Sequence, residues 1–512
     1  MPPKKKTTRK KKMKAPKTQL AANGATKVRV RMYRQGLGDC FLVTFFTGPK
    51  PVHMLIDCGT LGATTTGVKM PAVIKNISDT TGAHLDVLVA THEHKDHVSG
   101  FAGDPSPFDS FQVDQAWVAW TEDPSDELAK KISKYKGDLK MTVALAASAL
   151  GANAIADPPE GEAVKEMKSG IEKLLGFSDD VRVDEQPLGA TLAKGIDQLM
   201  RYVTNRAGNK GRFLLPGNVI EGAWLPGVRF YVLGPPQSES ALRNMGEHGS
   251  PELYSVAARF GSDLAAFSRF CLAGNSLDDY RESLDAEERQ GFDRRLPFDP
   301  RFRVEASDPT KCEKRFSSYY KKEDAWRRID ADWLGGGSDL AMQLDSYTNN
   351  TSLALAIELL DDKRVLLFPA DAQVGNWESW DDVKFKDDAG NEVNVRSADL
   401  LARTAFYKVG HHSSHNATVK ARGLELMERE DLVAMIPVDR KVAMKKTPPW
   451  QMPAKALYKR LVEKTMGRVV RSDVGWPDDS DRPSAISKAE WDAARKDSGV
   501  TITNLYVDYE LQ

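Results

Sequence analysis

Histidines gather at two places in this chain and are sparse elsewhere. Six of the nine histidines lie in two short segments, T-H-E-H-K-D-H and H-H-S-S-H. They are His92, His94, His97, His411, His412 and His415, and Asp96 stands among the first three. Imidazole and carboxylate groups are ligands that suit Zn, and also Mn or Fe. The two segments therefore predict a metal site.

The first histidine segment follows directly on an apolar run. Residues 85–90 (L-D-V-L-V-A) read as a buried strand, so the chemistry is expected at its carboxyl end. On an extended or looped backbone His92 and His94 point the same way, whereas Asp96 and His97 turn to a neighbouring position. This layout suits two adjacent ions rather than one. A solvated charged loop is the alternative, but such a pattern after an apolar strand is uncommon by chance.

Short β-type runs and helical stretches alternate along the chain. Strands are predicted at 28–33, 40–46, 52–57, 85–90, 212–220, 228–236, 352–360, 364–371, 405–410 and 500–509. The pair 352–360 and 364–371 forms a hairpin, and the strand 405–410 ends at His411. A helix is predicted at 454–464, after an apolar run at 432–438. Helical insertions are expected at about 100–210 and 236–345, and we assign no chemistry to the second.

Composition excludes several classes of protein. With 41% hydrophobic and 28% charged residues, the 512-residue chain has enough apolar material for a packed interior. No run approaches the roughly 18 apolar residues that span a bilayer, and the basic start lacks the apolar stretch of a secretory signal. Four cysteines without a C-x-x-C pair argue against a disulfide framework. We therefore expect a cytoplasmic protein without membrane insertion.

The zero net charge hides an asymmetry between the first residues and the remainder. Residues 1–27 carry ten Lys or Arg and no acid, which leaves 62 basic against 72 acidic residues in 28–512. Such a basic run cannot bury a core, so a disordered tail is predicted. It could bind nucleic acid or an acidic partner. A purely solubilising tail is the alternative.

The chain resembles the metallo-β-lactamase-fold hydrolase superfamily, and within it most nearly the ComEC-like branch, which includes the hydrolase domain of a DNA-uptake protein. The signature H-x-H-x-D-H matches residues 92–97, and R-M-Y-R-Q-G-L-G-D-C-F-L-V with L-I-D-C-G is similar to that branch's opening strands. N-N-T-S-L-A-L, L-L-F-P-A-D-A and F-Y-K-V-G-H-H-S-S are similar to its later elements. The likeness covers roughly 28–100, 212–235 and 349–475. It implies an αββα sandwich of two mixed sheets flanked by helices, with 28–512 as one decorated domain.

The resemblance also implies a division of labour among the site residues. His92 and His94 would hold a first ion, Asp96, His97 and His412 a second, and Asp371 would bridge both. Asp96 would also orient the nucleophile, and Asp39 and Asp57 would organise loops beneath the ions. One of His411 and His412 would stay unligated and contact a substrate oxygen or protonate a leaving group, and His411 is assigned that catalytic role, although the choice within the pair stays open.

Three positions depart from the pattern of the family. A further histidine ligand is often present between the signature and the bridging aspartate, and here only His248 lies between them, in a polar segment. Ser413 replaces a glycine of H-H-G-S, which would stiffen or narrow the loop. Met452 stands before Pro453 where that branch usually has histidine. The first ion is therefore expected to bind more weakly than the second.

Two adjacent divalent ions, Zn with Mn or Fe as alternatives, point to metal-assisted hydrolysis. The resemblance implies a phosphodiesterase that acts on nucleic acid or a nucleotide-like phosphodiester. The acidic body opposes a long phosphate backbone, so a small phosphodiester is the close competitor. Hydrolysis of a small ester or lactone, and a metal-binding scaffold whose insertions recruit partners, are the further alternatives.

Overall fold

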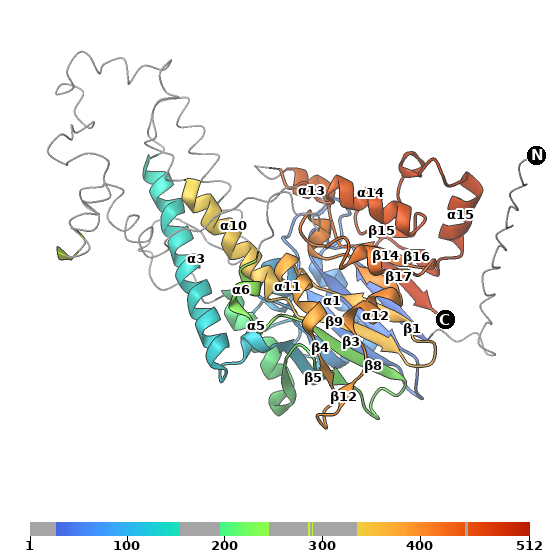
Figure 1. The fold of residues 1–512 in the computed structure, drawn as a ribbon, viewed down its shortest axis with the longest axis horizontal. Helices are drawn as coiled ribbons and strands as arrows, with labels where there is room; N and C mark the ends of the chain where they lie inside the picture. The colour runs from blue at the N-terminus through green and yellow to red at the C-terminus, as the bar shows by residue number, and fades with distance from the viewer. Residues whose placement is uncertain are drawn as a thin grey trace, which may run out of the picture.

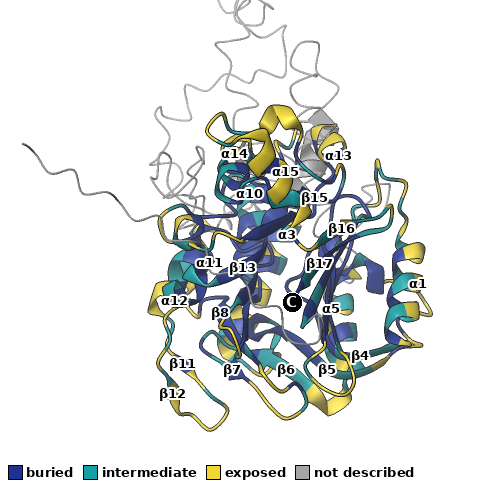
Figure 2. Ribbon diagram, turned by 90° about the vertical axis from the view of Figure 1, so that its right-hand side faces the viewer, coloured by how far each residue is buried: buried dark blue, intermediate teal, exposed yellow. Residues whose placement is uncertain are grey.

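The computed structural model describes residues 27–153, 171, 195–244, 285–286, 289, 335–445 and 449–512. Two mixed sheets lie face to face across an apolar core, and helices cover their outer faces (Figure 2). The predicted α/β sandwich of two mixed sheets is therefore present. Residues 1–26, which hold most of the basic tail, lie outside the described residues, as do large parts of both predicted insertions, 154–170, 172–194, 245–284 and 290–334.

The first sheet has eight strands in the order β16-β17-β1-β2-β3-β4-β5-β6. Neighbouring strands from β16 to β3 in this order are antiparallel, whereas β3 to β6 run parallel. The bounds are β1 Val28–Tyr33, β2 Cys40–Phe45, β3 Val52–Cys58, β4 His84–Val89, β5 Gln112–Ala119, β6 Gly211–Leu214, β16 Val500–Ile502 and β17 Tyr506–Leu511.

The alternating sequence of β1 explains its place in this sheet. Val28, Val30 and Met32 are fully buried in the core between the sheets. Arg31 points to the other face and donates two hydrogen bonds to Asp508 of β17, at 2.7 and 2.8 Å. The period of two therefore buries one side of the strand and pairs the other side with a neighbouring strand.

The second sheet has seven strands in the order β15-β14-β13-β10-β9-β8-β7, and β10, β13, β14 and β15 run parallel. The bounds are β7 Val219–Ile220, β8 Val228–Gly234, β9 Ala354–Leu359, β10 Val365–Phe368, β13 Thr404–Lys408, β14 Val433–Ile436 and β15 Val469–Arg471. A separate hairpin joins β11 Phe385–Lys386 to β12 Glu392–Val393. Phe41 of the first sheet meets Phe368 of the second edge to face, with ring centroids 5.8 Å apart.

The described residues form α-helices around the two sheets. They are α1 Met70–Thr81, α2 Lys95–Val98, α3 Glu127–Asn153, α5 Gly195–Arg206, α6 Glu239–Leu242, α10 Gly335–Asn350, α11 Val374–Glu378, α12 Ser397–Ala402, α13 Arg440–Met444, α14 Lys455–Lys464 and α15 Lys488–Lys496. α1 and α5 cover the first sheet, and α11, α12 and α14 cover the second. Helices α3 and α10 lie side by side and extend away from the sandwich (Figure 1). No helix among the described residues is long and apolar enough to cross a membrane.

Most predicted strands are confirmed, with three clear differences. The predicted strand 212–220 is two strands, β6 and β7, in different sheets, and the predicted strand 500–509 is the antiparallel pair β16 and β17. The segment 100–210, for which helices were predicted, contains strand β5, which pairs in parallel with β4 on one side and with the edge strand β6 on the other. Its first residues, Gln112–Gln115, are exposed or half-buried, and this polar start hides the strand from a search for apolar runs. The helical part of this segment therefore begins only after β5.

Candidate metal centre

The histidine and aspartate side chains meet at one edge of the sandwich, where strands of both sheets end. Asp57 lies near the end of β3 and His92 follows β4, while Asp371 follows β10 and His411 follows β13. A backbone hydrogen bond of 2.9 Å from Leu353 N to Thr91 O joins the two sheets at this edge. Residues far apart in the sequence therefore converge, as the motifs predicted.

Four buried side chains form a group that could hold a metal ion. Asp39, His97, Asp371 and His412 each offer one ligand atom, and these atoms all lie within 4.8 Å of one another. Each of the four residues is at most 2% exposed. Asp39, expected only to organise a loop, belongs to this group, and His412 belongs to it whereas His411 does not. The metal-binding potential predicted for these two segments is therefore present in the fold.

The hydrogen bonds of His412 fix the tautomer of its ring. Its Nδ1 lies 2.7 Å from the carbonyl oxygen of Pro437, and because a carbonyl only accepts, Nδ1 carries the proton. Nε2 lies 2.7 Å from Asp96 Oδ2 and 3.7 Å from Asp371 Oδ2. A neutral ring of this tautomer turns a lone pair toward two carboxylates. This contact is attractive only with a cation, either a proton on Nε2 or a metal ion.

His97 repeats the same pattern. Its Nδ1 donates to Asp57 Oδ2 at 2.8 Å, and Asp57 itself accepts from the backbone N–H and the hydroxyl of Thr91. Its Nε2 lies 3.1 Å from Asp371 Oδ2. A histidine that donates one ring N–H to a carboxylate and presents the other nitrogen inward is the usual arrangement of a metal ligand.

The charges of this region attract cations. Burial lowers the pKa of His97 and His412, but the carboxylates around them outweigh burial, so both pKa values lie above the usual range. Conversely, burial would raise the pKa of Asp371, but Lys408, His97 and His412 hold it well below its usual range. The pKa of Asp96 is lowered as well, against the effect of burial, by His97 and His412.

Lys408 occupies the floor of the cluster and is 1% exposed. Its ammonium group lies 2.5 Å from Asp39 Oδ2, 2.9 Å from Asp371 Oδ1 and 2.7 Å from the carbonyl oxygen of Ala370. Despite burial, these two carboxylates raise the pKa of Lys408. One fixed positive charge therefore neutralises only part of the negative charge of Asp39, Asp57, Asp96 and Asp371.

The donor set fits a divalent ion. Among the described residues, Asp39 Oδ1 and Asp96 Oδ1 are buried without a hydrogen-bond partner, and His97 Nε2 faces the carboxylate of Asp371 at 3.1 Å. Buried polar atoms are rarely left without a partner, and a cation beside them would satisfy these three atoms. Oxygen and imidazole ligands in a water-excluded cluster are chemically suited to Zn, Mn or Fe.

His92 and His94 lie directly beside this group. His92 Nε2 and His94 Nδ1 are 3.1 Å apart, and the rings of His92 and His97 have centroids 4.2 Å apart. Burial lowers the pKa of His92 well below its usual range and that of His94 to about 4. Both rings are therefore neutral at pH 7, which is the form that binds a metal.

His411 has a different environment from His412. Its Nδ1 accepts from the side-chain amide of Gln373 at 3.2 Å, and the Gln373 oxygen accepts from Asn416 at 2.8 Å. This leaves the proton of the neutral ring on Nε2, and burial lowers the pKa of His411 to about 3. The backbone is left-handed at His411, His412 and Ser413, with φ of 43°, 51° and 66°. Ser413 thus adopts a conformation that favours glycine.

Two residues near the cluster were missed by the sequence analysis. Asp345 lies on α10, in the segment to which we assigned no chemistry, and accepts from Asn349 at 3.1 Å. Burial, and then the carboxylates of Asp96 and Asp371, raise the pKa of Asp345 to about 7. Glu93, between the first two histidines, is 5% exposed and contacts α3. The local spacing of these residues carries no signal, because both contacts depend on how the insertion helices fold back.

Other candidate residues lie elsewhere. His248 falls outside the described residues. His84 lies at the opposite end of β4 with Asp86 and Asp114, in a half-exposed group whose ligand atoms also lie within 4.8 Å of one another. His53 is buried at the start of β3, and burial lowers its pKa. His415 is half-buried, and its pKa is lowered by burial.

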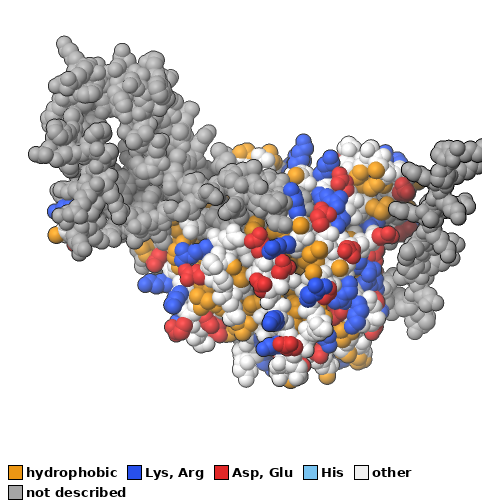
Figure 3. Space-filling view, viewed as in Figure 1, with side chains coloured by type: hydrophobic (Ala, Val, Ile, Leu, Met, Phe, Trp, Pro, Cys, Tyr) orange, Lys and Arg blue, Asp and Glu red, His pale blue; other side chains and the backbone are white. Residues whose placement is uncertain are grey.

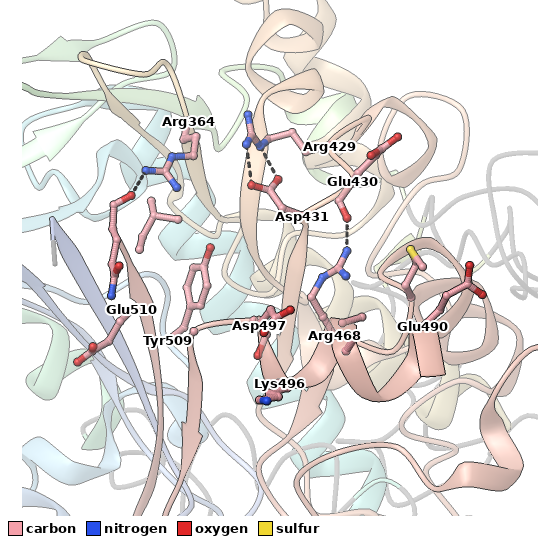
Figure 4. Close-up of a pocket in the computed structure, with 17 residues that line it drawn as sticks. Arg364, Arg429, Glu430, Asp431, Arg468, Glu490, Lys496, Asp497, Tyr509 and Glu510 are labelled. Atoms are coloured by element: carbon pink, nitrogen blue, oxygen red, sulfur yellow. Dashed lines mark hydrogen bonds and ion pairs between the residues drawn. The ribbon is translucent and has the colours of Figure 1, made fainter. Parts of the chain in front are cut away.

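A cavity of about 910 Å³ lies away from this cluster, at the amino ends of β10, β14 and β15 (Figure 4). Arg429 donates two hydrogen bonds of 2.7 Å to Asp431, and Arg468 donates to the carbonyl oxygens of Glu430 and Leu432. Arg364 donates to Asp362 and to the carbonyl oxygen of Gln512, so the arginines that line the cavity are already held by protein groups, and we assign it no ligand.

Basic and acidic side chains are interspersed over the described part of the face in Figure 3. This face therefore offers no uniform basic surface for a long phosphate backbone. Identification of the chain rests on the residues themselves, because no family model, no curated protein and no solved structure matches it.

Proposed function

We propose that the chain is a metal-dependent hydrolase of phosphodiesters with the metallo-β-lactamase-type αββα fold. One observation carries the proposal. His97 and His412 each donate Nδ1–H to a fixed acceptor and turn Nε2 toward the carboxylate of Asp371. Because water is excluded there, a cation is needed to hold these groups together.

The proposed ligand sets keep the division that the resemblance implies. His92 and His94 hold a first ion, Asp96, His97 and His412 hold a second, and Asp371 bridges them. The contacts of Asp96 and Asp371 with His412 Nε2, at 2.7 and 3.7 Å, support the second set. When bound, a pair of divalent ions lowers the pKa of a water to about 7 and clamps the attacking and leaving oxygens.

His411 is proposed as the group that contacts the substrate. Gln373 occupies its Nδ1, so its Nε2–H can donate a hydrogen bond to a phosphoryl or leaving-group oxygen. The low pKa of His411, about 3 through burial, keeps the ring neutral at pH 7. The neutral ring therefore serves at pH 7 as a hydrogen-bond donor to the substrate.

A nucleotide-like phosphodiester is the proposed substrate class. The interspersed charges of Figure 3 favour a small diester over a long duplex. The ten positive charges of residues 1–27 would add salt-dependent affinity for nucleic acid. Deleting residues 1–26 should therefore weaken nucleic-acid binding at low salt and leave the turnover of a small diester unchanged.

Elemental analysis and turnover together test the proposal. Protein purified without chelator should contain up to two Zn, Mn or Fe ions per chain and hydrolyse bis-p-nitrophenyl phosphate. A folded chain that takes up neither Zn nor Mn would contradict the metal site. Metal-loaded protein that cleaves lactones or carboxyl esters but no phosphodiester would replace the substrate class, and metal-loaded protein without any turnover would favour the scaffold.

A further inference from the structure

The helix α3 reaches back to the metal-binding segment through two lysines. Lys136 and Lys140 are one turn apart on α3, and both point their ammonium groups at Glu93. Their Nζ atoms lie 3.1 and 3.2 Å from the same oxygen, Glu93 Oε1. Glu93 stands between His92 and His94, so the contact ties α3 to the centre of the histidine segment.

This charge cluster is withdrawn from water. The side chains of Lys136, Glu93 and Lys140 are 4%, 7% and 14% exposed. Glu122 adds a second carboxylate, 3.9 Å from Lys136 Nζ, and burial raises its pKa. Ion pairs in such surroundings are much less screened than surface pairs, and removal of one partner leaves an uncompensated charge.

The position of Glu93 makes the cluster relevant to the two imidazoles. His92 and His94 are separated by this single residue, and their ring nitrogens lie 3.1 Å apart. The backbone of Glu93 therefore sets the angle between the two rings. A carboxylate held by two ammonium groups restricts that backbone, as outer partners of metal ligands commonly do.

The helix α3, which carries the two lysines, is held in place by its packing against α10. α3 packs along α10, where Tyr135 and Tyr347 meet edge to face with ring centroids 5.2 Å apart. At the end of α10, Asn350 accepts from the backbone and side-chain amides of Asn376, near the start of α11. Helices α3 and α10 are thus attached to α11, which covers the second sheet. Lys136 and Lys140 meanwhile contact Glu93, which follows a strand of the first sheet.

We propose that Lys136 and Lys140 are positioning residues, which act through Glu93 to orient His92 and His94 for the first ion. The inference rests on the proposed function, because it concerns one of the two ions assigned there. It gives α3 a role in the site, because the helix then supports the segment that carries the two histidines of the first ion. The second ion, held by Asp96, His97 and His412, is independent of this support.

Binding of Co²⁺ to the metal-free full chain tests the inference. Lys136→Met, Lys140→Met and Glu93→Gln should each weaken one of the two binding events about 10- to 100-fold and leave the other within threefold. The absorption spectrum of the affected Co²⁺ should change as well. Lys136→Arg, which keeps the charge, should retain most of the affinity.

A matched control lies on the same helix. Lys130 pairs with Glu127 at 2.6 Å on the surface, where the two side chains are 51% and 81% exposed, so Lys130→Met should alter neither event. A triple variant, Glu93→Gln with Lys136→Met and Lys140→Met, removes together the three charges that meet at Glu93 Oε1 and leaves Glu122, whose pKa burial raises, as the remaining carboxylate of the cluster. It should fold, as measured by thermal unfolding of the metal-free chain, and still bind the first ion weakly.

The outcomes separate this inference from the proposed function. If the single variants bind both ions with wild-type affinity and spectrum, or if the triple variant recovers the first ion fully, the positioning role is overturned. If the wild type itself takes up no Co²⁺, the proposed metal centre fails instead. Selective loss of one event in all three Met and Gln variants supports the inference.

Discussion

The two ends of strand β4 carry the same residue types in different surroundings. At its start, His84 Nε2 lies 3.0 Å from Asp114 Oδ2, and both side chains are 38% exposed. Beyond its end, His97 Nε2 lies 3.1 Å from Asp371 Oδ2, and these side chains are 0% and 1% exposed. Both ends therefore present imidazoles and carboxylates at ligand distance.

The two ends of β4 differ in the hydrogen bond of the second ring nitrogen and in their exposure to water. At the start of β4, a single hydrogen bond in a high-dielectric setting satisfies the pair and contributes little. At the other end, His97 and His412 have already donated Nδ1–H to Asp57 and Pro437, so their inward nitrogens need a cation. Proximity of ligand types is therefore insufficient evidence for a metal site, and fixed tautomers with excluded water are the better criterion.

The largest effect should come from Asp371, the proposed bridging ligand. Asp371→Asn removes a charge that contacts Lys408, His97 and His412, so it should weaken metal binding and lower the rate on bis-p-nitrophenyl phosphate at least about 100-fold. Asp114→Asn, the matched change at the exposed end, should leave both unchanged. Equal activity of wild type and Asp371→Asn, each folded by circular dichroism, would refute the assigned site.

The second ion should depend on Asp96 and His412. Asp96→Ala and His412→Ala each remove one partner of a 2.7 Å contact, and each should reduce the bound metal by one ion per chain and the rate at least about 100-fold. His84→Ala should retain the full metal content. Elemental analysis of the three purified variants measures this directly, and loss of an ion from His84→Ala would erase the contrast between the two ends of β4.

The thermal stabilisation of the protein by Zn²⁺ should increase with pH. Raised pKa values of His97 and His412 mean that the metal-free fold is stabilised by protonation below about pH 6.5, and this contribution is lost as the pH rises through the folded values. Zn²⁺ replaces those protons, so the Zn-induced increase in Tm should be larger at pH 8 than at pH 6. Thermal unfolding with and without Zn²⁺ checks this, and a shift that is independent of pH would contradict it.

The smallest effects should come from the strained backbone. Ser413 and Ala83 both have left-handed φ, 66° and 56°, and glycine relieves a cost of about 1 kcal/mol at such positions. Because glycine also loses more entropy on folding, each change to glycine should raise the free energy of unfolding by less than about 1 kcal/mol. Urea denaturation of the metal-free protein measures this.

The variants Ser413→Gly and Ala83→Gly also compare the two ends of β4 in their metal affinity. Ser413→Gly loosens the segment that holds His412 and should lower metal affinity a few-fold, whereas Ala83→Gly, next to His84, should not change it. If both variants bind Zn²⁺ as the wild type does, the rigidity of the segment around His412 has no part in metal binding.

Local patterns predicted the strands and the histidine segments, because buried strands and metal ligands leave periodic or clustered signals in the sequence. The strands β1 to β4 followed from such signals, whereas the convergence of residues 92–97 with Asp371 and His412 was expected from the family resemblance. The role of Lys408 did not, since a lysine in a strand is ordinarily exposed. Contacts of Asp345 and Glu93 arise from helices that fold back over long distances in sequence, and no local pattern encodes them.

The position of the cluster between the two sheets has a further consequence for the folding of the chain. An ion shared by Asp96 and His412 would join residues that are 316 positions apart. A cross-link that closes a loop of this length lowers the entropy of the unfolded chain. In the chain-entropy model this loss contributes about 5 to 6 kcal/mol to the free energy of unfolding at 25 °C. The ion would then cross-link the two halves of the sandwich as a disulfide does in secreted proteins. Unlike a disulfide, this cross-link would resist reducing agents and would be removed by chelators.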